Sequence, residues 1–158
     1  KVHLEIEIAE IQPEIEVEHR SAEEIQNILH GKRVLLVEDY PLDIEISRRI
    51  LEHVDVKVVS AQDGKAALEQ FKGEEPYHFD AILMDIQMPN MNGFVAARAI
   101  RKVAKPDAQI IPIIALSADD TPEDVRKCKE AGMNAHIAKP VEPQKLYQIL
   151  CEYLLAPI

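Results

Sequence analysis

From residue 32 onward, short apolar runs alternate with longer amphipathic segments. Runs this short and rich in Val, Ile and Leu are typical of strands in a parallel sheet buried on both faces. They predict strands at 33–38, 55–59, 80–85, 110–116 and 134–138. The segments between and after them predict helices at about 42–52, 64–72, 94–103, 121–131 and 143–154. Strands alternating with helices indicate an α/β fold with right-handed crossovers.

In the helix predicted at 42–52, one apolar stripe is evident. Its members are Leu42, Ile46 and Ile50. Such a stripe is typical of the helix face that packs on a sheet.

The first 30 residues follow a different pattern. Between residues 4 and 18, Ile, Leu and Val alternate with Glu, with a break at Pro13. This alternation predicts one half-buried strand or two short ones, which cannot be stable alone in water. Ser21 and Glu24 form a capping box, and Gly31 is a helix stop, so a short helix is predicted between them.

We therefore expect an N-terminal extension at 1–30 and a separate domain at 31–158. The strand-like segment is expected to pair with a second copy of the chain or with a neighbouring chain, giving a homodimer in the first case. The chain begins at Lys1, and we expect it to be a piece of a longer protein.

Composition narrows the class of protein. The chain has 158 residues, of which 47% are hydrophobic, and this favours one globular domain over disorder. A net charge of −10 argues against direct nucleic-acid binding. No apolar stretch approaches the roughly 20 residues of a membrane span, so no membrane contact is expected from this fragment, although its parent can carry an anchor. Cys128 and Cys151 lack metal-site spacing, and a reducing, cytoplasmic setting is predicted.

Charged residues follow three of the predicted strands. Glu38 and Asp39 end the first, Asp85 ends the third and Lys139 ends the last. In an open α/β sheet the functional crevice lies at the carboxyl ends of the strands, so these side chains are expected to meet. Carboxylates that repel one another need a cation, and Mg²⁺ usually takes one or two carboxylates, several waters and a phosphate. The pattern outlines a phosphoryl-transfer site.

Other strand-end residues fit the same chemistry. The Asp85 carboxylate is a competent nucleophile toward phosphorus. Ser117 ends the fourth strand, where its hydroxyl can donate to a phosphate oxygen. His136 lies inside the last strand without partners at metal-ligand spacing, and we expect a half-buried side chain that changes rotamer. The Lys139–Pro140 bond is a candidate cis peptide.

Together these residues resemble the receiver domain of two-component response regulators over residues 32 to 155. The stretch 131–140 is most similar to receivers fused to hybrid sensor histidine kinases. The matching motifs are Glu38-Asp39, Asp85 with Met88-Pro89 and Gly93, Ser117-Ala118, and Lys139-Pro140.

The resemblance implies a flavodoxin-like (βα)5 doubly wound sheet with strand order 2-1-3-4-5. It implies that Glu38, Asp39, Asp85 and the backbone carbonyl of Gln87 hold Mg²⁺, with Mn²⁺ as a substitute. Asp85 would take the phosphoryl group from a phosphohistidine. The donor would be a histidine kinase or a histidine phosphotransfer domain, and the parent protein would be a histidine kinase. Such receivers promote their own metal-dependent phosphorylation and dephosphorylation.

By the same resemblance, Ser117 and Lys139 would bind the phosphoryl oxygens, and Ser117 and His136 would form the conformational switch. Two positions depart from the family pattern. Tyr40 follows the acid pair where Asn, Asp or Glu is usual, and His136 stands where Tyr or Phe is frequent.

Two other functions fit part of this pattern. A haloacid dehalogenase-type phosphohydrolase also uses a strand-end Asp, but it needs a second Asp two residues later, where this chain has Gln87. A degenerate receiver that binds partners without phosphorylation is disfavoured, because all the expected acids, the hydroxyl and the lysine are present.

Overall fold

The computed structural model describes residues 20–88, 91–118 and 121–155. Five parallel strands form one sheet in the order β2-β1-β3-β4-β5, which confirms the predicted flavodoxin-like topology. The strands are β1 (Arg33–Val37), β2 (Lys57–Ala61), β3 (Ala81–Asp85), β4 (Ile113–Ser117) and β5 (Ala135–Ala138). The helices are α2 (Ala22–Leu29), α3 (Pro41–Glu52), α4 (Gly64–Gly73), α5 (Gly93–Arg101), α6 (Pro122–Glu130) and α7 (Pro143–Leu154).

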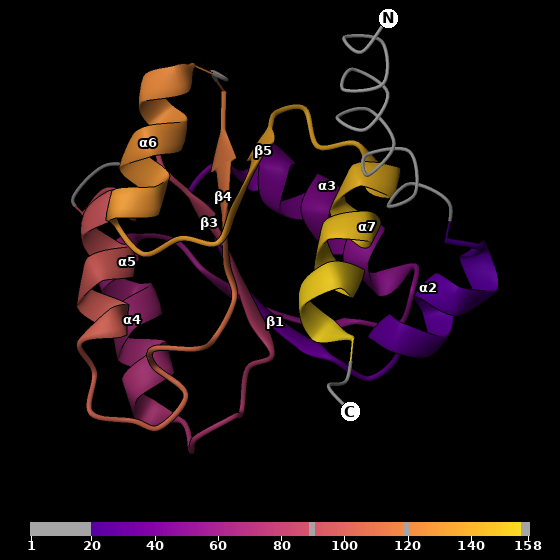
Figure 1. Ribbon diagram of the computed structural model, residues 1–158, viewed down its shortest axis with the longest axis horizontal. Coiled ribbons are helices and arrows are strands. Elements are labelled where there is room, and N and C mark those ends of the chain that lie inside the picture. Colours follow the sequence, from indigo (N-terminus) through magenta and orange to yellow (C-terminus); the bar gives the residue numbers. More distant parts are fainter. Residues whose placement is uncertain (1–19, 89–90, 119–120, 156–158) are drawn as a thin grey trace, which may run out of the picture.

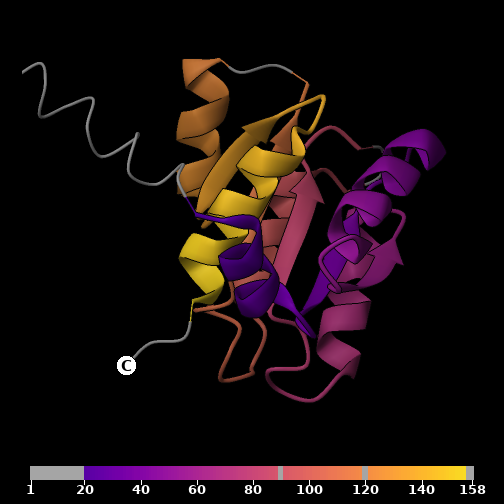
Figure 2. The same ribbon diagram turned by 90° about the vertical axis from the view of Figure 1, so that its right-hand side faces the viewer.

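Helices cover both faces of the sheet, as Figures 1 and 2 show. The central strand β3 is buried along its whole length. Its side chains alternate between two apolar layers: Ile82 and Met84 lie in the layer that includes α4, α5 and α6, and Leu83 lies in the layer that includes α2, α3 and α7. A strand with two buried faces is fixed in register, because a one-residue slip would move every side chain to the opposite layer. The residues at its end are therefore placed reproducibly.

Two strands begin later than predicted. β2 starts at Lys57 because Asp55 adopts a left-handed turn, with φ of 64°, and its carbonyl accepts the N–H of Gly31 at 2.9 Å. β4 starts at Ile113 because Ile110 lies in a turn, where its N–H donates to the Asp107 carbonyl at 3.2 Å and its side chain is 64% exposed. In both cases, hydrogen bonds that form a turn keep the first residues of the predicted strand out of the sheet.

The predicted stripe on α3 faces the core only in part: Ile50 is half-buried and packs against the core. Leu42 and Ile46 are 56% and 43% exposed, whereas Ser47 and Leu51 are buried. The helix is rotated so that a serine takes one of the inward positions. The exposed apolar side chains lie near the carboxyl end of the sheet, where a partner protein can contact them.

At the N-terminal side, α2 has the predicted capping box. The Ser21 N–H donates to Glu24 Oε1 at 2.9 Å, and the Glu24 N–H donates to Ser21 Oγ at 3.1 Å. The helix packs against α7, with Ile25 and Leu29 buried in the shared layer. The strand-like pattern of residues 4–18 lies outside the described residues. Of the helices that the structure describes, none combines the length and apolar character needed to cross a bilayer.

Gly93 packs closely under the loop that follows β3. A Cβ at this position would lie 2.6 Å from the Asp85 carbonyl oxygen and 2.7 Å from the Ile86 Cα. Both are backbone atoms, so Gly93→Ala is expected to lower the free energy of unfolding by about 1–3 kcal/mol in urea denaturation. Gly73→Ala is the matched control, because no atom lies within 4 Å of its Cβ position. Equal stability of the two variants would contradict this account of Gly93.

Candidate functional site

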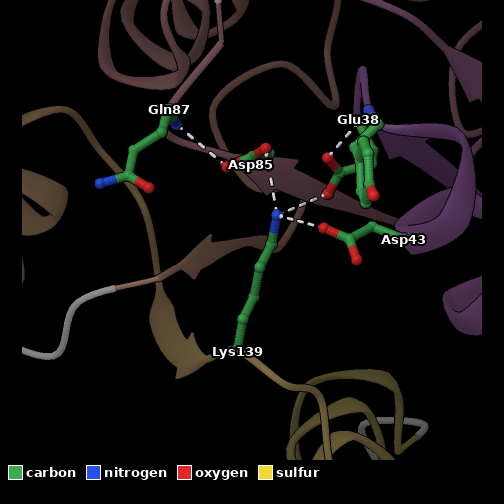
Figure 3. A network of polar contacts seen from close by, with 6 residues as sticks. Glu38, Asp43, Asp85, Gln87 and Lys139 are labelled. Atoms are coloured by element: carbon green, nitrogen blue, oxygen red, sulfur yellow. Dashed lines mark hydrogen bonds and ion pairs between the residues drawn. The ribbon is translucent and has the colours of Figure 1, made fainter.

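The predicted acids and the lysine meet at the carboxyl end of the sheet. Glu38 and Asp39 follow β1, Asp85 is the last residue of β3, and Lys139 follows β5. The parallel register brings these ends level: Val37 pairs with Met84. Glu38 and Asp85 are only 1% and 2% exposed, whereas Asp39 is open to solvent. Figure 3 shows Lys139 reaching from β5 toward the acids on the other elements.

The ammonium of Lys139 lies at the centre of this cluster. Its Nζ donates to Glu38 Oε1 at 2.9 Å, to Asp43 Oδ2 at 3.1 Å and to Asp85 Oδ2 at 3.2 Å (Figure 3). An ammonium has three protons, so these contacts use its full donor capacity. The lysine thus ties α3, β1 and β3 to the end of β5.

The carboxylates of the cluster outnumber its one ammonium, that of Lys139. Burial lowers the pKa of Lys139, but its hydrogen bond to Glu38 and the charges of Asp85 and Glu38 outweigh burial and raise the pKa above its usual value. Burial raises the pKa of Glu38 to about 7; the hydrogen bond with Lys139 opposes this shift and Asp85 reinforces it. Lys139 therefore stays charged, yet it does not offset all of the carboxylates around it.

The donor set fits a hard divalent cation. Ligand oxygens of Glu38, Asp39 and Asp85 all lie within 4.8 Å of one another. Carboxylate oxygens suit Mg²⁺ and Mn²⁺. The loop after β3 is held against the site, because the Gln87 N–H donates to Asp85 Oδ1 at 3.0 Å. Because Asp39 is the exposed member, the cluster is open to solvent on its side.

Sequence reasoning missed Asp43. This residue lies in the first turn of α3, which begins with Pro41, and its carboxylate is the third acceptor of Lys139. The proline at the helix start was the available signal, since it places Asp43 one turn beyond the acid pair. Tyr40, which departs from the family pattern, contributes to the site through its backbone: its N–H donates to Glu38 Oε2 at 3.3 Å.

Ser117 and His136 lie on the neighbouring strands of the same sheet. Ser117 is fully buried at the end of β4, and its carbonyl accepts the N–H of Lys139 at 2.7 Å. The Ser117 Oγ lies 3.5 Å from Asp124 Oδ2 on α6. His136 is half-buried on β5 and pairs in register with Ala115. The peptide bond after Lys139 is cis, as predicted.

Comparison with known proteins identifies this arrangement. The family model described as the response regulator receiver domain matches residues 34–151. The chain belongs to this family. The match covers the sheet from the second residue of β1 onward and every strand-end residue described above.

Several curated relatives of this chain are histidine kinases. The peroxide stress-activated histidine kinase mak1 of Schizosaccharomyces pombe is 40% identical over 121 residues, which cover 76% of this chain and 7% of that protein. Histidine kinase 3 of Arabidopsis thaliana is 30% identical over 151 residues, covering 84% of this chain and 14% of that protein. The chain thus spans only a small part of each relative.

Solved receiver structures agree with the fold. The receiver domain of the Pseudomonas aeruginosa sensor histidine kinase PA1611, which has a magnesium ion coordinated in its active site cleft, is 34% identical. It superposes with a TM-score of 0.71 over 80% of this chain and 99% of that one. The receiver of the Arabidopsis thaliana histidine kinase CKI1, complexed with Mg²⁺ and BeF3⁻, is 33% identical, with a TM-score of 0.72 over 83% and 95% of the two chains.

Proposed function

We propose that this receiver domain accepts a phosphoryl group from phosphohistidine onto Asp85, within a cytoplasmic phosphorelay run by a hybrid sensor histidine kinase. The placement of Asp85 carries the proposal. Its carboxylate is almost fully buried at the end of the central strand, with Lys139 Nζ 3.2 Å from Oδ2 and the Gln87 N–H 3.0 Å from Oδ1. The similarity to receivers of histidine kinases supports the choice of donor.

In the proposed transfer, an Asp85 carboxylate oxygen forms the new O–P bond. The N–P bond of the phosphohistidine breaks, and its electron pair goes to the imidazole nitrogen. Lys139 and the Gln87 N–H orient the carboxylate beforehand, which is a positioning effect. One ammonium N–H of Lys139 then donates a hydrogen bond to a phosphoryl oxygen, and the Ser117 O–H donates to another.

We propose Asp39, Asp85 and the backbone carbonyl of Gln87 as direct metal ligands, with Glu38 acting through water. Glu38 is given the indirect role because its Oε1 is already bonded to Lys139. A bound divalent cation supplies charge neutralisation for the acids and the incoming phosphoryl oxygens. Mg²⁺ is the proposed ion, and Mn²⁺ shares its ligand preference.

Acetyl phosphate tests this function without a partner protein. Incubation with Mg²⁺ should add one phosphoryl group per chain by intact mass, and a chelator should prevent the addition. No added phosphoryl group with Mg²⁺ would favour a degenerate receiver. Steady release of phosphate from many unrelated phosphate esters would favour a phosphohydrolase.

The apolar side chains beside the site support a docking surface for the histidine-bearing partner. Tyr40, Leu42 and Ile46 are 55%, 56% and 43% exposed, and they lie on or just before α3, next to the acid cluster. Exposed apolar groups gathered near a functional site are typical of protein interfaces. A cavity of about 40 Å³ adjoins them. Its lining residues are Asp43, Ile46, Ser47, Lys139, Pro140 and Val141.

We expect Leu42→Asp and Ile46→Asp each to slow phosphoryl transfer from a phosphorylated histidine phosphotransfer domain by about tenfold, because a charge would replace an interface anchor. Transfer from acetyl phosphate should be unchanged. Ile110→Asp is the control, since Ile110 is 64% exposed in the loop that precedes β4, away from the carboxyl ends of the strands. Equal slowing with both donors would show damage to the site and contradict the docking role.

We also propose that residues 1–30 are the end of an upstream kinase ATP-binding domain plus a linker helix, and that 31–158 is the receiver. The relatives are much longer than this chain, which supports further domains beside the receiver. The linker helix is α2, docked on α7 through Ile25 and Leu29.

A chain starting at Gly31 should still fold, because the sheet is complete, but with reduced stability. A dimer formed by the longer chain should weaken in the shorter one if the N-terminal segment pairs two copies.

A further inference from the structure

Helix α6 is held to the sheet by few apolar contacts. Its one buried residue is Cys128, whereas α5 buries four residues on the same face of the sheet. One turn before Cys128, the inner side of α6 carries an acid, Asp124, which is half-buried. An acid on the inward face of a helix is unfavourable unless it has a partner there.

The partner of Asp124 is a residue of the phosphorylation site. Asp124 Oδ2 lies 3.5 Å from the hydroxyl of Ser117, which is fully buried at the end of β4. Cys128, one turn further along α6, is buried on the same side of the helix. Burial, and after it the charge of Asp124, raises the pKa of Cys128 to about 11. The half-buried Asp124 carboxylate therefore reaches the end of β4.

The other end of α6 is anchored by Arg101 of α5. The Arg101 Nε and Nη2 donate to the Gly132 carbonyl at 3.0 and 2.8 Å, and Nη2 also donates to Asn134 Oδ1 at 2.9 Å. Asn134 Oδ1 in turn accepts the N–H of Ile113 on β4 at 2.8 Å. The C-terminal end of α6 is thus tied to α5 and the sheet, which leaves the end that carries Asp124 freer to shift.

We propose that Asp124 is a positioning residue that holds Ser117 in its resting orientation and is released when Asp85 is phosphorylated. This inference rests on the function proposed above. A serine hydroxyl has one proton, so a proton that it donates to a phosphoryl oxygen is no longer donated to Asp124. A phosphoryl group adds negative charge, which also repels the Asp124 carboxylate. Asp124 therefore lowers the fraction of chains in which Ser117 is ready to bind the phosphoryl group. The apparent affinity of the site for that group falls in proportion to this fraction.

Beryllofluoride with Mg²⁺ is the probe, titrated calorimetrically into the full chain as a phosphoryl analogue. Asp124→Asn removes the charge but keeps an acceptor oxygen, and the contact is long at 3.5 Å, so we expect binding to tighten by about two- to threefold, the low end of what one hydrogen bond gives. Glu123→Gln is the matched control. It removes the same charge from the first turn of α6, but its side chain is 63% exposed, and it should leave the affinity unchanged.

Two further arms separate this role from a general effect on the helix. In a Ser117→Ala background, Asp124→Asn should no longer change the affinity, because the contact acts through Ser117. In the metal-free chain, amide exchange in the first turn of α6 should be faster for Asp124→Asn than for Glu123→Gln. Equal affinity of wild type and Asp124→Asn, or an undiminished gain without Ser117, would overturn the inference. If the wild-type chain bound no beryllofluoride, the proposed function itself would fail.

Discussion

Asp85→Asn is expected to abolish phosphorylation by acetyl phosphate and by a phosphohistidine donor. The amide keeps the size of the side chain but is a poor nucleophile toward phosphorus. Asp85 is the acid that combines burial at a strand end with hydrogen bonds from both Lys139 and the Gln87 N–H. Intact mass after incubation with the donor and Mg²⁺ measures the result directly.

Asp43→Asn is the matched control for this prediction. Asp43 accepts from the same ammonium at 3.1 Å, but it lies on α3 rather than at the end of β3. The control should still take one phosphoryl group, at a reduced rate because Lys139 loses one of its charged partners. Full phosphorylation of Asp85→Asn at another aspartate would refute the assignment of the acceptor.

Asp39→Ala is expected to weaken Mg²⁺ binding by more than about tenfold and to slow phosphorylation in parallel. Even the mutation of a residue that only supports a metal ligand typically lowers metal affinity or activity by about 10–100-fold. Asp39 is exposed, so its loss should leave the fold intact. Calorimetric titration with Mg²⁺ gives the affinity. Glu69→Ala, which removes an exposed acid from α4, should bind Mg²⁺ as the wild type does. Unchanged metal affinity in Asp39→Ala would contradict the proposed ligand set.

Much of the fold follows from sequence because the three inner strands, β1, β3 and β4, are short, apolar and buried on both faces. β3 illustrates this, since all five of its residues are buried and its predicted end at Asp85 is correct. The rotation of α3 could not be predicted from its pattern. Leu42 and Ile46 fit an inward stripe but are exposed, and Ser47 is buried in their stead, because contacts of the whole helix decide its orientation.

The same distinction holds for the site. Glu38, Asp85 and Lys139 were predicted to meet because each follows a strand, and strand ends in a parallel sheet share one edge. Asp43 and Asp124 were not singled out, because both lie on helices whose side chains reach the site only through tertiary packing. Polar residues on helices are usually solvated, so nothing in the sequence distinguished Asp124, and only the proline at the start of α3 pointed to Asp43.

The most direct test of the central claim is to locate the phosphoryl group on the wild-type chain. After phosphorylation with Mg²⁺, borohydride reduction converts an aspartyl phosphate to homoserine, and tandem mass spectrometry identifies the modified residue. The account predicts homoserine at position 85, formed only when both the phosphodonor and Mg²⁺ are present. Homoserine at any other position, or none in a chain that has gained a phosphoryl group, would contradict it.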